Sequence, residues 1–354
     1  MELLSVTMND GVKPRSEIEG KDNSSEDKSN YKIVRKGDMV YNSMRMWQGA
    51  NGISPCDGIV SPAYTVLMPK QEINNGYFAA LFKSTKLINE FRKNSQGMTS
   101  DTWNLKYPQI ETIKVQIPSV SEQNIVSALF SVLDARIVAQ AQLVESLKKY
   151  KRGVVSKVFS EIARKCNTIR LGDCVTISRG GSPRPIDSYI TNDPDGINWI
   201  KIGDTSADEL YITRTKEKII PSGVKKSRKV FQGDLILSNS MSFGRPYILQ
   251  IDGCIHDGWL LIRDESNVFE KRFLCYYLGS DNVFTQYKRF AAGSCVNNLN
   301  SELVGDVEIC CPPRSIQQKV ADMLAVLDSR IAHSSRIYEA LQQMRTSLLQ
   351  QLFI

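Results

Sequence analysis

Long apolar runs and histidines are scarce in this sequence, and each scarcity excludes a class of protein. No apolar stretch approaches the roughly 18 residues that a membrane-spanning helix needs. The N-terminus has no basic segment followed by an apolar one, so no secretory signal peptide is expected. With two histidines, and eight cysteines without a C-x-x-C pair, few ligands are available for a zinc site. We expect a cytoplasmic protein whose thiols are free.

Motifs of common catalytic sites are also missing. The chain has no G-x-x-x-x-G-K-[ST] phosphate loop, no G-x-G-x-x-G after a predicted strand, and no Asn-Pro-Pro-aromatic or Asp-Pro-Pro-aromatic motif of amino-methyltransferases. Ser240 or Ser294 beside His256 could be proposed as a nucleophile, but no motif supplies the third group of a triad. The sequence therefore predicts a protein that is not an enzyme and that holds no metal or cofactor of its own.

What is present is the composition of a folded protein with a small positive charge. Hydrophobic residues make up 42% and charged residues 23% of the 354 residues, and the net charge is +7. The length fits two globular domains with connectors. A mildly basic total permits a nucleic-acid partner without establishing one, because phosphate contacts need basic residues on one face.

The most informative feature is a duplicated segment. Residues 117–160 align without a gap onto residues 311–354, at a constant offset of 194. Gln123 falls on Gln317, and the densest match places residues 132–137 (Val-Leu-Asp-Ala-Arg-Ile) on residues 326–331 (Val-Leu-Asp-Ser-Arg-Ile). A repeat of this length indicates duplicated architecture. It predicts two domains, each followed by the same helix.

Both copies of the repeat show the periodicity of a long helix. Apolar residues recur at spacings of three and four, and Ser121 and Ser315 are predicted as the N-caps. About 40 residues span roughly 60 Å, too long for one small core, so the two helices are expected to pair as an antiparallel coiled coil. Polar residues interrupt the seam at Gln140 and Lys151, and again at their equivalents Ser334 and Arg345. The predicted seam consists of Phe130, Leu133, Ile137, Val144, Leu147, Leu324, Leu327, Ile331, Tyr338 and Leu341.

The regions before the helices correspond more loosely. Gly37-Asp38 resembles Gly233-Asp234, and Asp57-Gly58 resembles Asp252-Gly253, each a turn that enters a strand. Both regions are typical of short strands followed by one or two helices and a last strand, so an α+β fold is predicted. The first region lacks the opening strand that the second has at residues 168–177. The predicted domains are residues 1–117 and 161–311, and the predicted helices are residues 118–160 and 312–354.

Taken together, the repeated Gly-Asp turns, the proline and glutamine entry to each helix and the Val-Leu-Asp-x-Arg-Ile start resemble one family. Over essentially the whole chain, the sequence is similar to DNA-specificity subunits of Type I restriction-modification systems. The resemblance implies that the two domains are target recognition domains, each reading half of a split DNA sequence, and that the helices set the spacing between the halves. It also implies two docked modification subunits that carry S-adenosylmethionine and methylate adenine, and restriction subunits that translocate DNA.

Loops that mix basic, amide and aromatic residues are the candidates for DNA contact. Arginine suits guanine and asparagine suits adenine through paired hydrogen bonds to base edges, and lysine suits phosphates. The alternative, that the aromatic residues pack in a core and the lysines form a solvated face, stays open. The candidates are Asn42, Ser43, Arg45, Trp47, Arg179, Arg184, Lys225, Lys226, Arg228, Asn239 and Arg245.

Two other functions also stay open. One is a coiled-coil protein-interaction adaptor without intrinsic DNA specificity, and the other is a methyltransferase or nuclease with an unrecognised motif. Binding to a specific duplex that weakens steeply with salt would separate DNA recognition from the adaptor. Activity of the purified chain alone would identify an enzyme.

Overall fold

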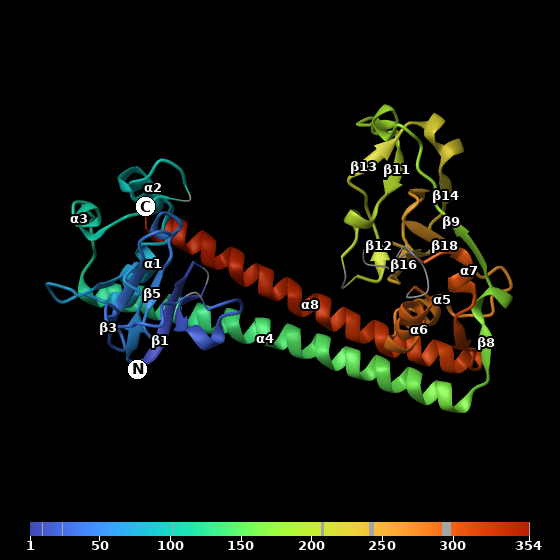
Figure 1. The fold of residues 1–354 in the computed structure, drawn as a ribbon, viewed down its shortest axis with the longest axis horizontal. Helices are drawn as coiled ribbons and strands as arrows, with labels where there is room; N and C mark the ends of the chain where they lie inside the picture. Colours follow the sequence, from blue (N-terminus) through green and yellow to red (C-terminus); the bar gives the residue numbers. More distant parts are fainter. Residues whose placement is uncertain are drawn as a thin grey trace. The chain divides into compact units, whose positions relative to one another are not determined.

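A computed structural model describes residues 1–353 except 9, 23, 101, 207–208, 241–243 and 292–298. The chain divides into two compact units, unit 1 with Met1–Val144 and His333–Ile354, and unit 2 with Glu145–Ala332. Each unit contains one of the predicted globular domains and one end of each long helix (Figure 1).

Both predicted long helices are present, as α4 (Val120–Lys165) and α8 (Arg314–Leu352). Ser119, not Ser121, caps α4. Its backbone N–H donates to the Glu122 carboxylate at 3.0 Å, and its hydroxyl faces the Glu122 N–H at 3.4 Å, the reciprocal arrangement of a capping box. The second predicted cap was also wrong, because Ser315 lies inside α8. Ser121 and Ser315 are each the second residue of their helix, so neither occupies the N-cap position.

α4 is more apolar than expected, because the sequence predicted no apolar stretch near the length of a membrane-spanning helix. By length and composition it could cross a membrane, with a mean hydropathy of 1.3 over its most apolar window. Only 17% of that window is buried. Apolar side chains of α4 are therefore left exposed within the units.

Unit 1 contains two small sheets. One has the strand order β2-β1-β6-β3, with β1 and β6 parallel, and the other has the antiparallel order β5-β4-β7. Short helices follow the sheets. The elements are β1 (Glu2–Thr7), β2 (Gly11–Pro14), η1 (Arg15–Glu17), β3 (Lys32–Val34), β4 (Met39–Asn42), η2 (Met46–Gln48), β5 (Asn51–Ile53), β6 (Gly58–Val60), β7 (Tyr64–Leu67), α1 (Asn75–Leu81), α2 (Thr85–Asn94) and α3 (Tyr107–Ile110).

Unit 2 contains larger versions of both sheets, with the orders β10-β13-β11-β17-β14 and β12-β16-β15-β18-β9, and a short pair β19-β8. Its strands are β8 (Thr168–Arg170), β9 (Thr176–Arg179), β10 (Ile190–Thr191), β11 (Ile197–Ile200), β12 (Tyr211–Ile212), β13 (Glu217–Ile219), β14 (Arg228–Val230), β15 (Leu235–Ser238), β16 (Pro246–Leu249), β17 (Gly253–Ile255), β18 (Trp259–Arg263) and β19 (Glu308–Cys310). Its helices are η3 (Leu171–Asp173), η4 (Ile186–Ser188), η5 (Ile202–Asp204), η6 (Pro221–Lys226), α5 (Lys271–Leu278), α6 (Asp281–Ala291) and α7 (Ser301–Gly305).

Strands of unit 1 have counterparts in the larger sheets of unit 2. β5-β4-β7 corresponds to β16-β15-β18, and β1 pairs with β6 in parallel as β11 pairs with β17. Unit 2 adds β9 beside β18, and its opening strand β8 pairs with β19. Among the described residues of unit 1, no strand lies beside the outer edge of β7, and no strand lies between α3 and α4. The prediction of a last strand directly before α4 was therefore wrong for unit 1.

The paired turns are built alike in both units. Gly37 and Gly233 have φ values of 91° and 89°, a conformation that favours glycine. In unit 1, the Asp57 carboxylate accepts the backbone N–H before Gly37 at 2.8 Å. In unit 2, Asp252 accepts the N–H before Gly233 at 2.7 Å. The two sequence motifs in each domain are therefore halves of one hydrogen-bonded turn.

A buried glutamine ties each globular domain to a long helix. Gln123 and Gln317 are each 1% exposed. The Gln123 side-chain oxygen accepts the N–H of Asn74, the N-cap of α1, at 2.9 Å. The Gln317 oxygen accepts the N–H of Glu270, the N-cap of α5, at 2.7 Å. Each amide nitrogen donates at 2.9 Å to the carbonyl of a proline just before its helix, so both ends of the side chain are satisfied.

Each core also receives a phenylalanine from the end of a long helix. In unit 2, Phe159 of α4 is fully buried and stacks on Tyr277 of α5, with ring centroids 4.6 Å apart. In unit 1, Phe353, just after α8, stacks on Phe130 at 6.0 Å and meets Tyr77 edge-on at 5.4 Å. Phe159 and Phe353 are equivalent positions of the repeat.

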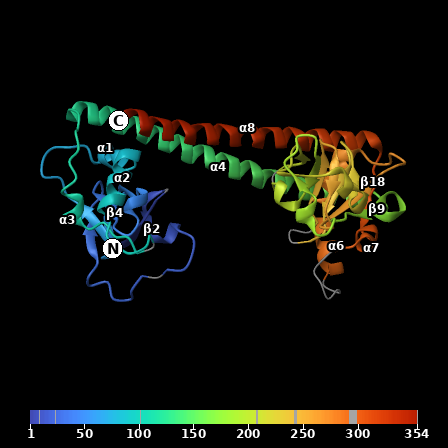
Figure 2. The same ribbon diagram turned by 90° about the horizontal axis from the view of Figure 1, so that it is seen from above.

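Within each unit the two long helices run antiparallel, as both ribbon views show (Figure 2). In unit 1, the Gln140 amide donates to the Ser334 carbonyl at 2.9 Å, and Arg345 pairs with Asp134. In unit 2, Lys151 pairs with Asp328. The polar residues that interrupt the predicted seam thus bond across it. Of the seam residues, Phe130, Leu133, Val144, Leu324 and Ile331 are buried, and Ile137, Leu147, Leu327, Tyr338 and Leu341 are half-buried.

Candidate nucleic-acid interface

The clearest candidate site is the loop of residues 180–185 in unit 2, which follows β9. Its backbone is held to the neighbouring strands: the Gly180 N–H donates to the Trp259 carbonyl at 2.9 Å, and the Gly181 N–H donates to the Ile255 carbonyl at 3.2 Å. A Cβ on Gly180 would lie 2.1 Å from the His256 carbonyl oxygen, so only glycine allows this close approach. The loop is a fixed support for the side chains that it carries.

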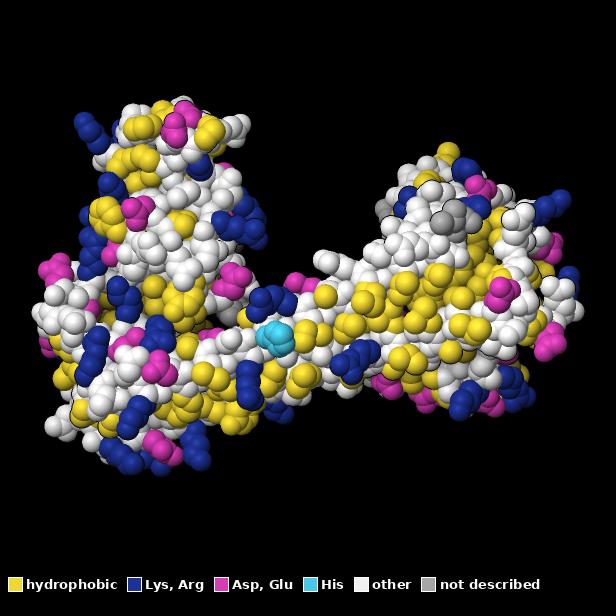
Figure 3. Space-filling view, turned by 180° about the vertical axis from the view of Figure 1, so that it is seen from behind, with side chains coloured by type: hydrophobic (Ala, Val, Ile, Leu, Met, Phe, Trp, Pro, Cys, Tyr) yellow, Lys and Arg dark blue, Asp and Glu magenta, His cyan; other side chains and the backbone are white. Residues whose placement is uncertain are grey.

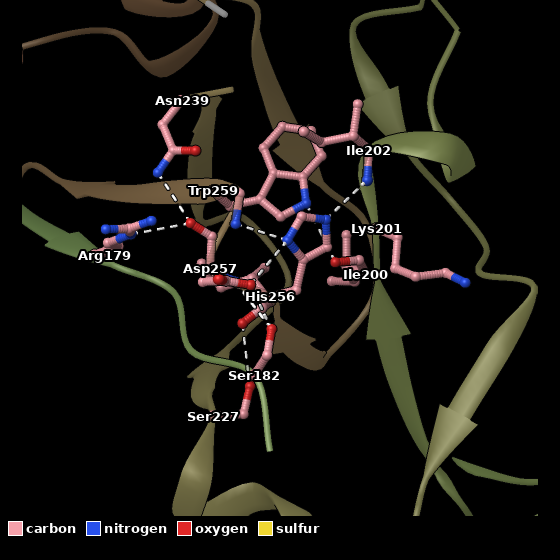
Figure 4. Close-up of polar contacts among 12 residues, drawn as sticks. Arg179, Ser182, Ile200, Lys201, Ile202, Ser227, Asn239, His256, Asp257 and Trp259 are labelled. Atoms are coloured by element: carbon pink, nitrogen blue, oxygen red, sulfur yellow. Dashed lines mark hydrogen bonds and ion pairs between the residues drawn. The ribbon is translucent and has the colours of Figure 1, made fainter. Parts of the chain in front are cut away.

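Asp257, in the turn before β18, is the centre of the polar contacts at this loop (Figure 4). Its backbone carbonyl accepts from Arg179 Nε and from Asn239 Nδ2, each at 3.0 Å. Its carboxylate accepts the Ser182 hydroxyl at 2.5 Å, and this hydrogen bond is the main reason that the pKa of Asp257 lies below its usual value. Asp257 is therefore ionised at neutral pH and clamps the loop.

The neighbouring His256 is structural. The Gly258 N–H donates to its Nδ1 at 2.7 Å, and the Ile202 N–H lies 3.3 Å from Nε2. Burial lowers the pKa of His256, which favours the neutral ring, and a neutral ring can accept the Gly258 N–H at Nδ1 while Nε2 carries its own proton. Among the described residues, no hydrogen bond joins Ser240 to this ring, and Ser294 lies outside the described residues. The histidine therefore holds the turn and does not activate a serine among the described residues.

Predicted basic residues of unit 2 gather around the same loop. The Arg228 Nε donates to the Arg179 carbonyl at 3.1 Å, and Lys226 donates to the Tyr189 hydroxyl at 2.6 Å while lying over its ring. A lysine ammonium over an aromatic face keeps its charge at the surface. Five of the predicted cations are exposed in this region, namely Arg179, Arg184, Lys225, Lys226 and Arg228. Their contact with DNA stays a prediction.

The remaining candidates of unit 2 do not share this surface equally. Asn239 is 2% exposed and its amide donates to Asp257, so it is not available to a base edge and the prediction for it was wrong. Arg245 is exposed, and its backbone N–H donates to Ser238 at 3.0 Å. Residues 241–243 of the predicted loop lie outside the described residues.

The candidate loop of unit 1 is partly structural. Ser43 is buried and faces the Thr65 hydroxyl at 3.1 Å, which contradicts its predicted role in DNA contact. The Asn42 side chain accepts the Met44 N–H at 3.0 Å. The half-buried Arg45 makes no side-chain hydrogen bond with the described residues, which leaves its guanidinium available.

Trp47 belongs to an aromatic cluster that the sequence did not indicate. Its indole N–H donates to the Met44 carbonyl at 3.1 Å, and its ring meets Trp103 edge-on with centroids 5.1 Å apart. Arg92 lies over the same ring at 5.8 Å. The three side chains come from distant parts of the sequence, so no local pattern could have revealed the cluster. Because the indole N–H is already used, a DNA contact by Trp47 would have to come from its ring.

Metal ligands do not gather among the described residues of either unit. Across the part of the chain that the structure describes, no group of three or more His, Cys, Asp or Glu side chains could hold a metal ion. All the described cysteines are buried or half-buried, and burial raises the pKa of the Cys254 thiol.

Comparison with known proteins adds a family to this geometry. A family model described as the Type I restriction modification DNA specificity domain matches residues 5–149 and 164–343. The Type I restriction enzyme MjaVIII specificity subunit of Methanocaldococcus jannaschii is 21% identical over 349 residues, covering 90% of this chain and 78% of that protein. The putative MjaX specificity subunit of the same organism is 21% identical over 301 residues, covering 79% of this chain and 67% of that protein.

Two solved structures share the fold. A chain of the structure called "Structural basis underlying complex assembly and conformational transition of the type I R-M system" matches with a TM-score of 0.63 at 19% identity, covering 93% of this chain and 84% of that one. The Type-I restriction-modification system S subunit from M. genitalium matches with a TM-score of 0.58 at 16% identity, covering 91% and 84%. At these identities the likeness establishes a shared fold, which is the predicted α+β fold with long helices.

Proposed function

The chain belongs to the Type I restriction modification DNA specificity family, and we propose that its two heads, residues 1–117 and 161–311, each read one half of a split DNA sequence. Its function is sequence-specific DNA recognition in a Type I restriction-modification complex, and it is a non-catalytic subunit of that complex. It assembles with methyltransferase and restriction subunits and with DNA. We place this assembly in the cytoplasm.

The basic surface around the 180–185 loop of unit 2 is the observation that carries the proposal. Exposed arginines and lysines surround a backbone that is fixed to two sheets. Duplex DNA attracts such a surface through its phosphates, while a fixed loop can present side chains to base edges with little loss of entropy. The coiled-coil adaptor does not account for this surface.

Exposed apolar side chains on the long helices support the docking of partner subunits. On the face in Figure 3, hydrophobic side chains gather along these helices. Large apolar residues are exposed at three pairs of repeat-equivalent positions: Leu129 and Met323, Val132 and Val326, Tyr150 and Met344. Equivalent surfaces suit equivalent partners, so we propose that two modification subunits dock, one in each unit. S-adenosylmethionine and adenine methylation belong to those subunits in this proposal.

The experiment is to express the chain with its neighbouring modification and restriction subunits and to map methylated adenines across a genome. A matched strain without the chain is the control. We expect a motif of two short halves, separated by a fixed unread spacer, that appears only when the chain is present. Binding of the assembled complex to that duplex should weaken steeply as salt rises. The absence of any chain-dependent split motif would refute the proposal, and salt-independent partner binding alone would favour the adaptor.

A further inference from the structure

Arg184 stands apart from the other cations of the 180–185 loop. The Arg179 guanidinium is bonded to the Asp257 carbonyl, and Arg228 is bonded to the Arg179 carbonyl. The Arg184 side chain is 82% exposed and makes no hydrogen bond with the described residues. Its guanidinium therefore keeps its donors free, although its backbone belongs to a fixed loop.

A carboxylate lies beside this free guanidinium. Asp257 Oδ2 is 3.8 Å from Arg184 Nη2, while Asp257 Oδ1 accepts the Ser182 hydroxyl. Oδ2 accepts no hydrogen bond from the described residues. The same aspartate thus fixes the loop through one oxygen and faces the arginine with the other.

The loop also borders a hollow of about 640 Å³, whose lining includes Pro183, Trp199, Lys201 and His256. Trp199 is buried, and Lys201 is paired with Glu217, so its charge is balanced. The hollow gives a base edge room to approach Arg184 without displacing the loop.

We propose that Arg184 reads a guanine in one half of the target, with Asp257 as its positioning residue. The arginine fork matches the O6 and N7 acceptors of guanine in the major groove. A phosphate contact is the alternative, but the ionised Asp257 would repel a phosphate. A free carboxylate oxygen is compatible with a G·C pair, because it can accept from the N4 amino group of cytosine. This inference rests on the proposed function, and it assigns the recognition of one base pair of the DNA target to two residues.

The test uses the full assembled complex, with methylated motifs mapped for the wild type and for Arg184→Ala, Arg184→Lys and Asp257→Asn. We expect Arg184→Ala to lose roughly 10- to 100-fold of the preference for G·C at one position of one half, while the other half is unchanged. Arg184→Lys should lose much of that preference, because lysine lacks the planar fork. Asp257→Asn should relax the same position although the asparagine side-chain oxygen can still accept the Ser182 hydroxyl that fixes the loop, so the change reports on the carboxylate charge.

Arg164→Ala is the matched control, because it removes an exposed positive charge near the end of α4. Competition between duplexes substituted at each position measures the same preference in solution. If Arg184→Ala weakens binding to all duplexes equally and keeps the motif, Arg184 contacts a phosphate and the inference is wrong. An unchanged motif and affinity would overturn it as well. If the wild-type complex shows no split motif, the proposed function itself fails, so the two failures are distinguishable.

Discussion

The Lys83 side chain, between α1 and α2 of unit 1, is largely shielded from solvent. Burial lowers its pKa to about 8, and the nearby Arg345 lowers it further while Asp134 opposes the shift. In the unfolded chain a lysine titrates near 10.4. The unfolded state therefore binds more protons between about pH 8 and 10, so the free energy of unfolding rises with pH across this window and is lowest below it.

Replacing this lysine should stabilise the protein at neutral pH. Lys83→Met removes the cost of burying the charge, and we expect the free energy of unfolding to increase by about 2 kcal/mol at pH 7 and to change little above pH 10. Lys86→Met, at an exposed position of α2, is the control and should be nearly neutral at both values. Urea denaturation at several pH values provides the measurement. A pH-independent effect of Lys83→Met would contradict the burial argument.

Gln317 is a residue whose size matters less than its two hydrogen bonds. Gln317→Met keeps the volume but leaves the Glu270 N–H and a proline carbonyl unpaired in a buried place, so we expect a loss of about 2–3 kcal/mol of stability. The adjacent Gln318→Met, on the exposed side of α8, should cost far less. The two urea midpoints give the comparison, and equal shifts would show that the buried amide is dispensable.

At the scale of elements, α4 and α8 are joined by two ion pairs at equivalent positions of the repeat, and these pairs differ in how far they are exposed to solvent. The Asp328 side chain is 21% exposed, pairs with Lys151 and also accepts the Tyr276 hydroxyl at 2.6 Å. The Asp134 side chain is 47% exposed and pairs with Arg345. Asp328→Asn should therefore cost about 2 kcal/mol, and Asp134→Asn less than about 1 kcal/mol. Each variant serves as the control for the other in thermal denaturation, and a larger effect of Asp134→Asn would overturn the argument.

How far each element could be predicted depends on the range of the interactions that form it. The long helices were predictable because their apolar spacing is local, and the Gly-Asp turns because glycine permits their backbone angles. The helix start at Ser119 was also readable, since Glu122 completes the capping box three residues later. The strand pairings were not predictable, because neighbouring strands of a sheet can lie far apart in the sequence, as when Glu2 of β1 pairs with Gly58 of β6.

The candidate site also contains residues that could be predicted from the sequence and residues that could not. Exposed cations in a glycine-containing loop could be predicted from composition, as for Arg179 and Arg184. An amide, however, suits a buried carbonyl as well as a base edge, so the pattern could not tell that Asn239 bonds to Asp257. The role of Asp257 was missed altogether, since its partner Ser182 lies 75 residues earlier in the chain.

For the whole molecule, the repeated apolar surfaces predict how many partners are lost with each substitution. Val132 is 71% and Val326 58% exposed at equivalent positions. We expect Val132→Asp to release one modification subunit and Val326→Asp to release one, because a charge buried in an apolar interface is costly. The double variant should bind none, and Val132→Leu, which keeps the surface apolar, should bind two. Native mass measurement of the complex counts the subunits, and loss of both copies from a single substitution would argue against separate docking surfaces.

The phenylalanines at the helix ends limit how genes for such chains can recombine. Head 1 is followed in the gene by the helix that carries Phe159, yet Phe159 packs in unit 2, while Phe353, encoded at the far end, packs in unit 1. A new head acquired by exchange must therefore carry an aromatic residue, as Tyr277 is in unit 2, that packs against the phenylalanine of the helix that follows the other head in the sequence. Its DNA-facing loops can diverge freely, whereas this aromatic packing site must stay compatible with the phenylalanine.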